Sequence, residues 1–371
     1  MKTAEAVTPQ ARSAVQFDPA FKPDFEEARE RWAAFWQGEI VDRPVAMIRC
    51  PKAGVERRPE GRYMEGRDGD YDAVIDRFEA WAATVAWLGE AIPVYVPSFG
   101  PDMFAGFLGA PLNYGTQGDT NTSWSEPCVE DWAAALPLAI APENPVWVRT
   151  QEFVARLAER SRGRWVVAHL DMHSNLDALA AMRGPERLCM DLLDEPETID
   201  RAIAQMGPLY RMVDRRLREL GRMDQTGSSG WIPMYCEGRF NVTQSDFSCM
   251  VGPDQFRRFV LPALEEELAA LDHSIYHLDG PDALRHLDDL LALERLDAIQ
   301  WVPGAGRPPH KGWLELLKRI VGAGKSVIVY CAPAEVPLFH EALGPRRVIY
   351  DLRAKTEAEG RGVLDWLKAH T

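Results

Sequence analysis

Short apolar runs alternate with longer amphipathic stretches along most of the chain, and this alternation limits the fold more than any single motif does. The runs that predict strands cover residues 45–49, 94–96, 165–169, 232–235, 274–277, 298–301, 327–330 and 348–350. The stretches that predict helices include residues 71–90, 196–220, 253–271, 311–321 and 357–369. Because strands that alternate with helices form parallel sheets, eight such strands predict an α/β fold, a (β/α)8 TIM barrel.

The chain is longer than such a barrel needs. A (β/α)8 barrel typically takes ~250 residues, whereas this chain has 371. The surplus predicts an N-terminal helical extension that starts at Pro23, together with enlarged loops after the strands. Enlarged loops are expected near residues 113–127, 222–230 and 237–252. We expect residues 1–22 to form a flexible arm and residues 23–371 to form one domain, because no repeat or low-complexity linker divides them. A doubly wound sheet is the alternative fold, but residues 51–54 supply no glycine-rich turn after the first strand.

The charge balance and the cysteines limit the partners and the setting of the chain. Lys and Arg number 42 against 56 Asp and Glu, which gives a net charge of −14. Nucleic acids and anionic membranes bind clustered positive charge, so neither is expected as a partner. The six cysteines form no CxxC pair, which argues against a zinc ribbon or a disulfide framework and favours a cytoplasmic setting. We also expect no signal peptide and no membrane span, because no apolar stretch of the required kind is present.

Two groups that can bind a metal or move a proton stand at the end of the fifth predicted strand. His277 and Asp279 follow residues 274–276 and precede Gly280-Pro281. Residues two apart on a strand point to the same face, and the carboxyl ends of parallel strands are where such folds keep their chemistry. Imidazole and carboxylate suit zinc or another divalent ion. We therefore predict that His277 and Asp279 are catalytic residues and metal ligands; the alternative is a hydrogen-bonded histidine and a loop-capping aspartate.

Polar residues also follow the other predicted strands. Glu237 ends the fourth and could be a metal ligand or a general base, and Cys331 ends the seventh and could be a thiolate ligand, although free cysteine is commonly a small buried apolar residue. The predicted substrate-binding residues are His169, Asp171, His173, Tyr235, Arg239, Trp301 and Tyr330. Arg239 suits an anionic substrate because its planar guanidinium matches a carboxylate. Since the strand bodies stay apolar while these groups gather at one predicted edge, the sequence predicts an active site there.

Several motifs run in a familiar order along most of the chain. They are Arg43-Pro44-Val45, residues 176–183 followed by Gly184-Pro185-Glu186, residues 246–250 followed by 253–259, residues 276–280 and residues 297–304. On these motifs the chain resembles the uroporphyrinogen decarboxylase superfamily, which includes the corrinoid-dependent methyltransferases, from about Phe25 to its C-terminus. The resemblance implies a (β/α)8 barrel with a deep pocket, and it implies a homodimer.

The resemblance also implies a zinc site, with one substitution. Methyltransferase members hold zinc with a His-x-Cys motif on the fifth strand and a distant cysteine near the last strand, and the zinc activates a thiol that takes a methyl group from a corrinoid. His277 matches the histidine of this motif, but Asp279 stands in place of the cysteine, and Cys331 lies one strand too early. A carboxylate leaves the metal more electrophilic than two thiolates would, which permits it to polarise an oxygen substrate instead. The cobalamin-binding pattern Asp-x-His-x-x-Gly is absent, so the corrinoid would come on a separate protein.

The decarboxylase branch of the superfamily fits less well. That branch holds its substrate with an arginine-rich N-terminal loop and an aspartate. Gly61-Arg62-Tyr63 is similar to that loop, but residues 97–100 supply no aspartate at the expected place. Decarboxylation of uroporphyrinogen is therefore not expected.

Three functions are open at this point. The first is a metal-dependent methyltransferase, in which His277, Asp279, Glu237 and Cys331 hold a divalent metal, expected to be zinc. It would move a methyl group between a small methylated substrate and a corrinoid carried on a separate protein. The alternative is a decarboxylase or lyase that acts on a small carboxylic acid, with Arg239 holding the carboxylate. The third is a barrel that only binds a ligand or a corrinoid protein.

Overall fold

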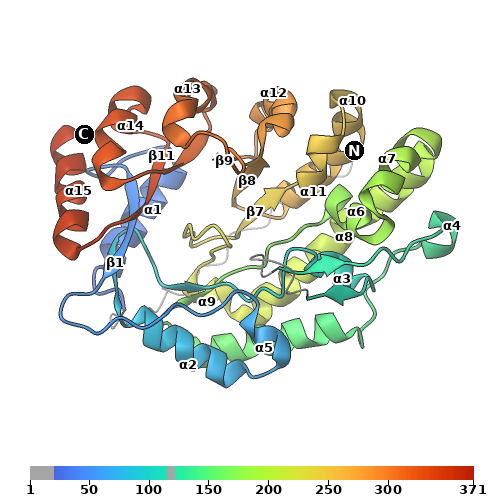
Figure 1. Cartoon of the computed structure of the whole chain (residues 1–371), viewed down its shortest axis with the longest axis horizontal. Helices are drawn as coiled ribbons and strands as arrows, with labels where there is room; N and C mark the ends of the chain where they lie inside the picture. The colour runs from blue at the N-terminus through green and yellow to red at the C-terminus, as the bar shows by residue number, and fades with distance from the viewer. Residues whose placement is uncertain (1–20, 115–121) are drawn as a thin grey trace, which may run out of the picture.

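The computed structural model describes residues 21–114 and 122–371 and shows a mixed α/β fold with a parallel central sheet (Figure 1). The predicted N-terminal arm, residues 1–22, lies almost wholly outside the described residues, as does the middle of the loop at 113–127. None of the helices in the described ranges is long and apolar enough to cross a membrane.

The strands and helices alternate as follows. The strands are β1 (Val45–Pro51), β2 (Val85–Gly89), β3 (Val94–Tyr95), β4 (Leu112–Asn113), β5 (Trp124–Ser125), β6 (Val166–Val167), β7 (Phe240–Gln244), β8 (His273–Asp279), β9 (Ala298–Val302), β10 (Ser326–Tyr330) and β11 (Val348–Arg353). The α-helices are α1 (Phe25–Trp36), α2 (Tyr71–Ala82), α3 (Met103–Phe107), α4 (Trp132–Ala135), α5 (Pro145–Ser161), α6 (Asn175–Arg183), α7 (Pro185–Asp194), α8 (Pro196–Gly221), α9 (Met223–Thr226), α10 (Pro253–Gln255), α11 (Leu261–Ala269), α12 (Leu287–Ala292), α13 (Leu314–Gly322), α14 (Val336–Leu343) and α15 (Glu357–His370). Short 3₁₀ turns cover Glu65–Asp68, Asp246–Met250, Pro281–His286, His310–Trp313 and Pro333–Glu335, and a π-helical turn covers Phe256–Val260.

The largest sheet has seven strands in the order β2-β1-β11-β10-β9-β8-β7. Every neighbouring pair in it is parallel except β1 and β2. β3 and β6 pair in parallel in a second sheet, and β4 and β5 form a small antiparallel pair. Helices surround these strands, with α2 and α5 on one side of the molecule and α13 to α15 on another (Figure 1). Within the described ranges no ladder joins β1 to β3, so the hydrogen-bonded sheet is open there.

The strand predicted at residues 232–235 is wrong, and the strand that takes its place is β7. Pro233 lacks the N–H that a sheet ladder needs, and the amide of Met234 bonds back to the carbonyl of Ile232 at 2.7 Å in a tight turn. In β7, β-branched Val242 and Thr243 favour the extended backbone, and the strand pairs with β8 along its whole length. The segment 235–239 therefore precedes this strand instead of ending one.

The helix predicted over residues 71–90 divides into α2 and β2. The Thr84 hydroxyl donates to the Trp81 carbonyl at 2.8 Å and closes the end of α2, after which Val85 and its neighbours pair with β1. Gly89 ends β2 with a φ of +59°, where an added Cβ would collide with the carbonyl oxygen of Ala46. Glycine is required at this crossing because only a residue without Cβ fits both the backbone angle and the space.

Candidate active site

A row of polar side chains crosses the carboxyl ends of β7, β8 and β9. Gln244, His277 and Gln300 are register neighbours on these three strands, so their side chains lie on the same face of the sheet. The Nδ1 of His277 lies 2.5 Å from the Oε1 of Gln300, and the Nε2 of Gln300 donates to the hydroxyl of Tyr330 at 2.6 Å. An amide oxygen can only accept, so this contact places the proton of neutral His277 on Nδ1 and leaves Nε2 as an acceptor.

A second imidazole lies beside the first. His173 follows β6, and its Nε2 lies 3.3 Å from Asp171 Oδ2 and in contact with the side-chain amide of Gln244. Asp246 lies between the two histidines, with Oδ1 3.9 Å from His277 Nε2 and Oδ2 4.0 Å from His173 Nδ1. One carboxylate thus faces two imidazoles, an arrangement that can hold and transfer protons.

The electrostatics of this cluster keep protons on it. Burial by itself lowers the pKa of His173, but the nearby charge and hydrogen bond of Asp171, with Asp177 and Asp246, outweigh it and raise the pKa to about 10. Burial and the charge of Asp246 raise the pKa of Asp177 to about 7. Burial, together with the charge of Asp246, also raises the pKa of Asp279 against the opposing charge of His277. His173 is therefore a cation at neutral pH, and Asp177 is near its half-protonated point.

The structure brings some of the sequence-predicted residues together. Asp171, His173, His277 and Tyr330 lie in or beside the network of hydrogen bonds and charges described above, and Asp279 lies close enough to His277 and Asp246 to interact with their charges. Asp177 holds the loop that carries Asp246, because its carboxylate accepts from the amide of Asp246 at 3.0 Å.

The residues predicted at the end of the fourth strand lie elsewhere. Because β7 begins only at Phe240, the segment 235–239 lies at the amino end of the sheet, opposite to His277. Glu237 pairs there with Arg29 of α1 at 2.6 Å, and Arg239 pairs with Asp272 at 3.2 Å. Tyr235 packs edge-on against Phe25 of α1.

Three further predicted residues face away from the polar row. His169 is fully buried and lies 3.2 Å from Asp214 of α8. Trp301 alternates with Gln300 along β9 and packs against Trp313, at a ring distance of 4.9 Å. Cys331 follows Tyr330, and burial raises the pKa of its thiol to about 12, which disfavours the thiolate that binds metals.

The four residues predicted as zinc ligands do not form a ligand set. Glu237 is at the opposite end of the sheet from His277, and the Cys331 thiol is held in its protonated form. In the part of the chain that the structure describes, no group of three or more His, Cys, Asp or Glu side chains is arranged to hold a metal ion. The donor atoms of the described residues therefore do not fit the expected zinc.

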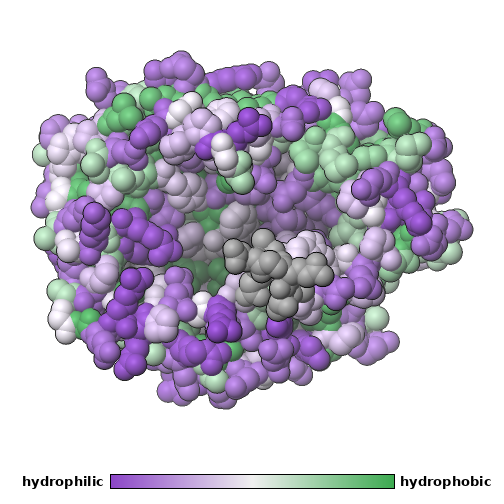
Figure 2. Space-filling model, in the orientation of Figure 1, coloured by the Kyte–Doolittle hydropathy of each residue, from purple (hydrophilic) through white to green (hydrophobic). Residues whose placement is uncertain are grey.

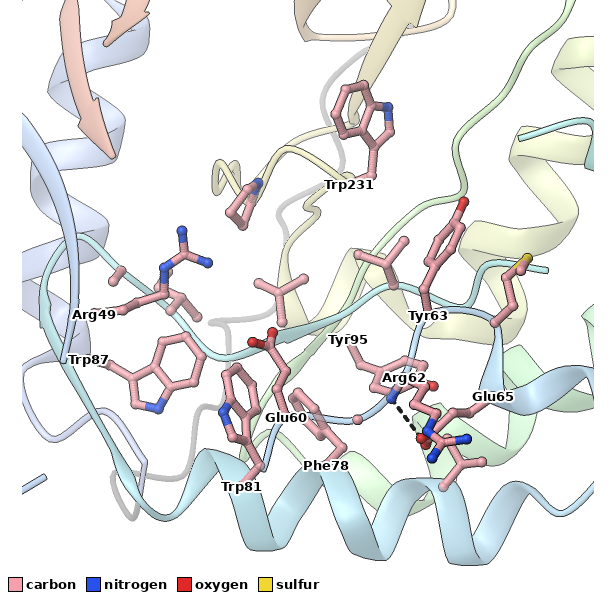
Figure 3. Close-up of a pocket in the computed structure, with 18 of the residues that line it drawn as sticks. Arg49, Glu60, Arg62, Tyr63, Glu65, Phe78, Trp81, Trp87, Tyr95 and Trp231 are labelled. Carbon is pink, nitrogen blue, oxygen red and sulfur yellow. Dashed lines mark hydrogen bonds between the residues drawn. The ribbon is translucent and has the colours of Figure 1, made fainter. Parts of the chain in front are cut away.

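A cavity of about 350 Å³ opens beside the polar row (Figure 3). It lies between β1 and β3, where the sheet is open, and its walls come from β1, α2, β2, β3, the segments that connect them, and Trp231 with Pro233. Two of its lining residues link it to the polar row. Trp231 packs edge-on against His277 at 5.0 Å, and Arg49 pairs with Asp351, the register neighbour of Tyr330, at 2.6 Å. The face in Figure 2 is hollowed near its middle, with apolar residues in its depth.

Several residues of this site were not singled out from the sequence. Gln300 and Arg49 carry a signal, because each is a polar residue within an apolar strand and so must face either a polar interior or solvent. Asp246 and Asp177 belong to the motifs at residues 246–250 and 176–183, but the sequence assigns neither of them to the site. Trp231 carries no signal, since it belongs to a segment without secondary structure whose place depends on the fold.

By its geometry the chain is a mixed α/β protein that has a parallel sheet and polar groups at the carboxyl edge of that sheet. No family model matches the chain, and no curated protein matches it in sequence. Among solved structures, a methyltransferase from Methanosarcina mazei superposes with a TM-score of 0.57 over 92% of this chain and 98% of the other, at 11% sequence identity. At this identity the likeness shows a shared fold.

Proposed function

We propose that the chain is a methyltransferase that moves a methyl group between a small methylated compound and a corrinoid carried on a separate protein. The proposal includes a (β/α)8 barrel of the superfamily that the sequence resembles, and a homodimer. It is supported by the fold shared with a methyltransferase over 92% of the chain. The observation that carries it is the pair of imidazoles around Asp246, placed at the strand ends beside an aromatic cavity.

The chemistry of demethylation explains why such a pair is useful. When a methyl ether loses its methyl group, the carbon–oxygen bond breaks and the oxygen keeps the electron pair, so it needs a proton. His173 carries a proton at neutral pH and can give it to the leaving oxygen, while Asp171 stabilises the cation beforehand. His277, held by Gln300, offers an acceptor nitrogen that orients the substrate. The corrinoid, when bound, accepts the methyl group.

The direct test uses free cob(I)alamin as the methyl acceptor. The protein is incubated with methyl ethers, methyl thioethers and methylamines, and the formation of methylcobalamin is followed by absorbance. We expect turnover with at least one methyl ether, and a loss of about 10²-fold or more in kcat for His173→Gln. His340→Gln is the matched control, because His340 lies at α14 and bonds to the carbonyl of His370. Equal rates in His173→Gln and wild type would contradict the assigned acid.

One observation favours a second candidate, a decarboxylase or lyase that acts on a small carboxylic acid. Arg49 and Arg62 both line the cavity, whereas Arg239, predicted to hold the carboxylate, does not. This activity would release carbon dioxide from a carboxylic acid without any corrinoid. Measuring carbon dioxide and methylcobalamin in the same reactions therefore separates the two candidates, and binding without either product would favour a ligand-binding protein.

A further inference from the structure

The walls of the cavity are built from aromatic rings. Trp81 of α2 and Trp87 of β2 are both about nine-tenths buried and meet edge-on with ring centres 5.5 Å apart. Phe78 stands against Trp81 at 5.8 Å and against Tyr95 at 5.1 Å, so these rings form one continuous surface (Figure 3). Aromatic rings in the wall of a cavity favour aromatic ligands, which they contact face-on or edge-on.

The size of the cavity limits the ligand to a small one. Its volume of about 350 Å³ is roughly twice the ~150 Å³ of a cavity that holds benzene. A single ring with two substituents fits this space, whereas a tetrapyrrole is much too large for it. The lining therefore selects a one-ring compound.

A buried donor in the cavity lacks an acceptor. Arg49 uses Nη2 to bind Asp351 at 2.6 Å, but its Nε is buried and no described residue accepts its hydrogen. Buried donors in native proteins are nearly always satisfied, so this N–H points to an acceptor that a ligand brings. An oxygen that lies against Nε also reaches the edge of the guanidinium, the geometry in which arginine binds a carboxylate.

The other charges of the cavity do not remove this preference. Glu65 is occupied, because it accepts from the amide of Arg62 at 2.6 Å and pairs with Arg77 at 3.1 Å. The exposed side chain of Arg62 adds a positive charge at the lining, and exposed Glu60 adds a negative one. Arg49 is therefore the partly buried charged residue of the lining that has a buried donor without an acceptor.

Arg49 and Trp231 fix a direction across the cavity. Arg49 stands toward one side in Figure 3 and Trp231 toward another, and the ring of Trp231 contacts His277. Trp231 is therefore the lining residue that joins the cavity to the imidazoles, and a ring substituent that reaches Trp231 comes near His277.

We propose that the cavity binds a planar aromatic carboxylic acid, with the carboxylate on Arg49 and the ring against Trp81 and Trp87. This inference rests on the proposed function for the far substituent, which would be the methylated oxygen. The binding itself does not depend on methyl transfer.

The test measures binding by calorimetry with three probes and no corrinoid. Benzoate has both the ring and the carboxylate, cyclohexanecarboxylate has the carboxylate without the flat ring, and benzylammonium has the ring with a cation. We expect benzoate to bind at least about tenfold more tightly than benzylammonium. Benzylammonium cannot accept the charge-assisted hydrogen bond from Arg49, and the guanidinium repels its cation. Cyclohexanecarboxylate is expected to bind severalfold more weakly than benzoate.

Two variants keep the test independent of folding. Arg49→Gln removes the positive charge but leaves Asp351 without its partner. Arg49→Lys is therefore the second variant, because it keeps a cation beside Asp351 and lacks the Nε donor. Both are expected to weaken benzoate binding about tenfold or more and to leave benzylammonium no weaker. The control is Arg353→Gln, because Arg353 is the register neighbour of Arg49 but is exposed and lies outside this cavity.

Each outcome decides the proposal. Benzylammonium binding as tightly as benzoate, or unchanged benzoate binding in Arg49→Lys, would overturn it. Benzoate binding that depends on Arg49, without methylcobalamin formation from any methoxybenzoate, would support the binding site and contradict the proposed function. Turnover of methyl ethers without benzoate binding would support the proposed function and contradict the binding site.

Discussion

Three buried groups near the carboxyl edge hold protons at pH values where the same groups would lose them in water. The pKa of His173 is raised to about 10, that of Asp177 to about 7, and that of Glu267 to about 8. Glu267 lies on α11, where burial raises its pKa against the opposing hydrogen bonds from Ser174 and Asn175. In each case the folded state binds more protons than the unfolded state, so each group lowers the stability as the pH rises toward its folded pKa.

Glu267→Gln tests this effect at one residue. The contribution of Glu267 is fully present below its unfolded pKa of 4.5 and is lost as the pH rises to about 8. The glutamine variant lacks this titration, so we expect its free energy of unfolding to rise relative to that of the wild type by on the order of 3 kcal/mol between pH 5 and pH 8. Urea unfolding at the two pH values measures it. Exposed Glu265→Gln is the control, and an equal pH response in both variants would contradict the assignment.

The proposed role of His173 has its own pH signature. Because the pKa of His173 is about 10, the proton that it donates is present through the neutral range and is lost as the pH rises through that value. We expect kcat for methyl transfer to fall tenfold per pH unit above that value, as the loss of one proton requires. This fall in kcat is expected to be absent in His173→Gln. A limb that persists in the variant would assign the titration to another group.

At the scale of the elements, the joint between β1 and β2 depends on one buried ion pair. Arg43 binds both oxygens of Glu90 at 2.6 and 2.8 Å, and Glu90 also accepts from the amide of Ala46 at 2.8 Å. Glu90 is fully buried, and its charge is compensated by these groups together with Arg31, whose Nη1 lies 3.6 Å from Oε1. The joint sets where β2 leaves β1, and so it sets the position of the tryptophan wall of the cavity.

We therefore expect Glu90→Gln to destabilise the protein by about 3–5 kcal/mol, because it leaves the Arg43 charge buried without a partner. Replacing both residues together, as Arg43→Met with Glu90→Leu, is expected to recover much of this loss. Thermal and urea unfolding of Glu90→Gln, of Arg43→Met and Glu90→Leu alone, and of the double variant would measure it. A double variant as unstable as the sum of the single ones would show that the two residues act independently.

The sequence predicted most elements because their signals are local. The expected strands other than the fourth lie where the structure has them, since each is a β-branched apolar run beside a helix. The fourth predicted strand is displaced because Pro233 interrupts it. The helix predicted over residues 71–90 stops early because the end of α2 depends on the Thr84 hydroxyl. The order of the strands was enough to place His277 and His173 at the carboxyl edge of the sheet. Glu237, Arg49 and Trp231 could not be placed, because their positions follow from the register of β7 and from the gap beside β1.

At the scale of the whole molecule, the fold brings together groups from almost the entire chain. The cavity is built mainly from residues 47–96, and the proton-carrying groups come from residues 171–330. The two meet at Trp231 and at the pair of Arg49 with Asp351. Of the predicted metal ligands, Glu237 lies at the opposite end of the sheet from His277.

The metal content of the purified protein checks this arrangement. Since Glu237 lies away from His277 and no other set of described ligands replaces it, we expect zinc well below one equivalent after purification without chelator. His277→Ala is expected to have the same content by plasma mass spectrometry. Near-stoichiometric zinc that is lost in His277→Ala would show that the side chains rearrange around a metal, and it would restore the metal-dependent mechanism.

The antiparallel attachment of β2 to β1 has a consequence for how the protein can change. Because β2 and α2 form the tryptophan wall while the parallel strands carry the histidines, the ligand preference and the chemistry lie on separate stretches of sequence. Exchanging residues 47–96, which carry both Arg49 and the tryptophans, with those of a relative would therefore change the ligand preference and keep the same catalytic groups. We therefore expect sequence variation among relatives to concentrate in this stretch.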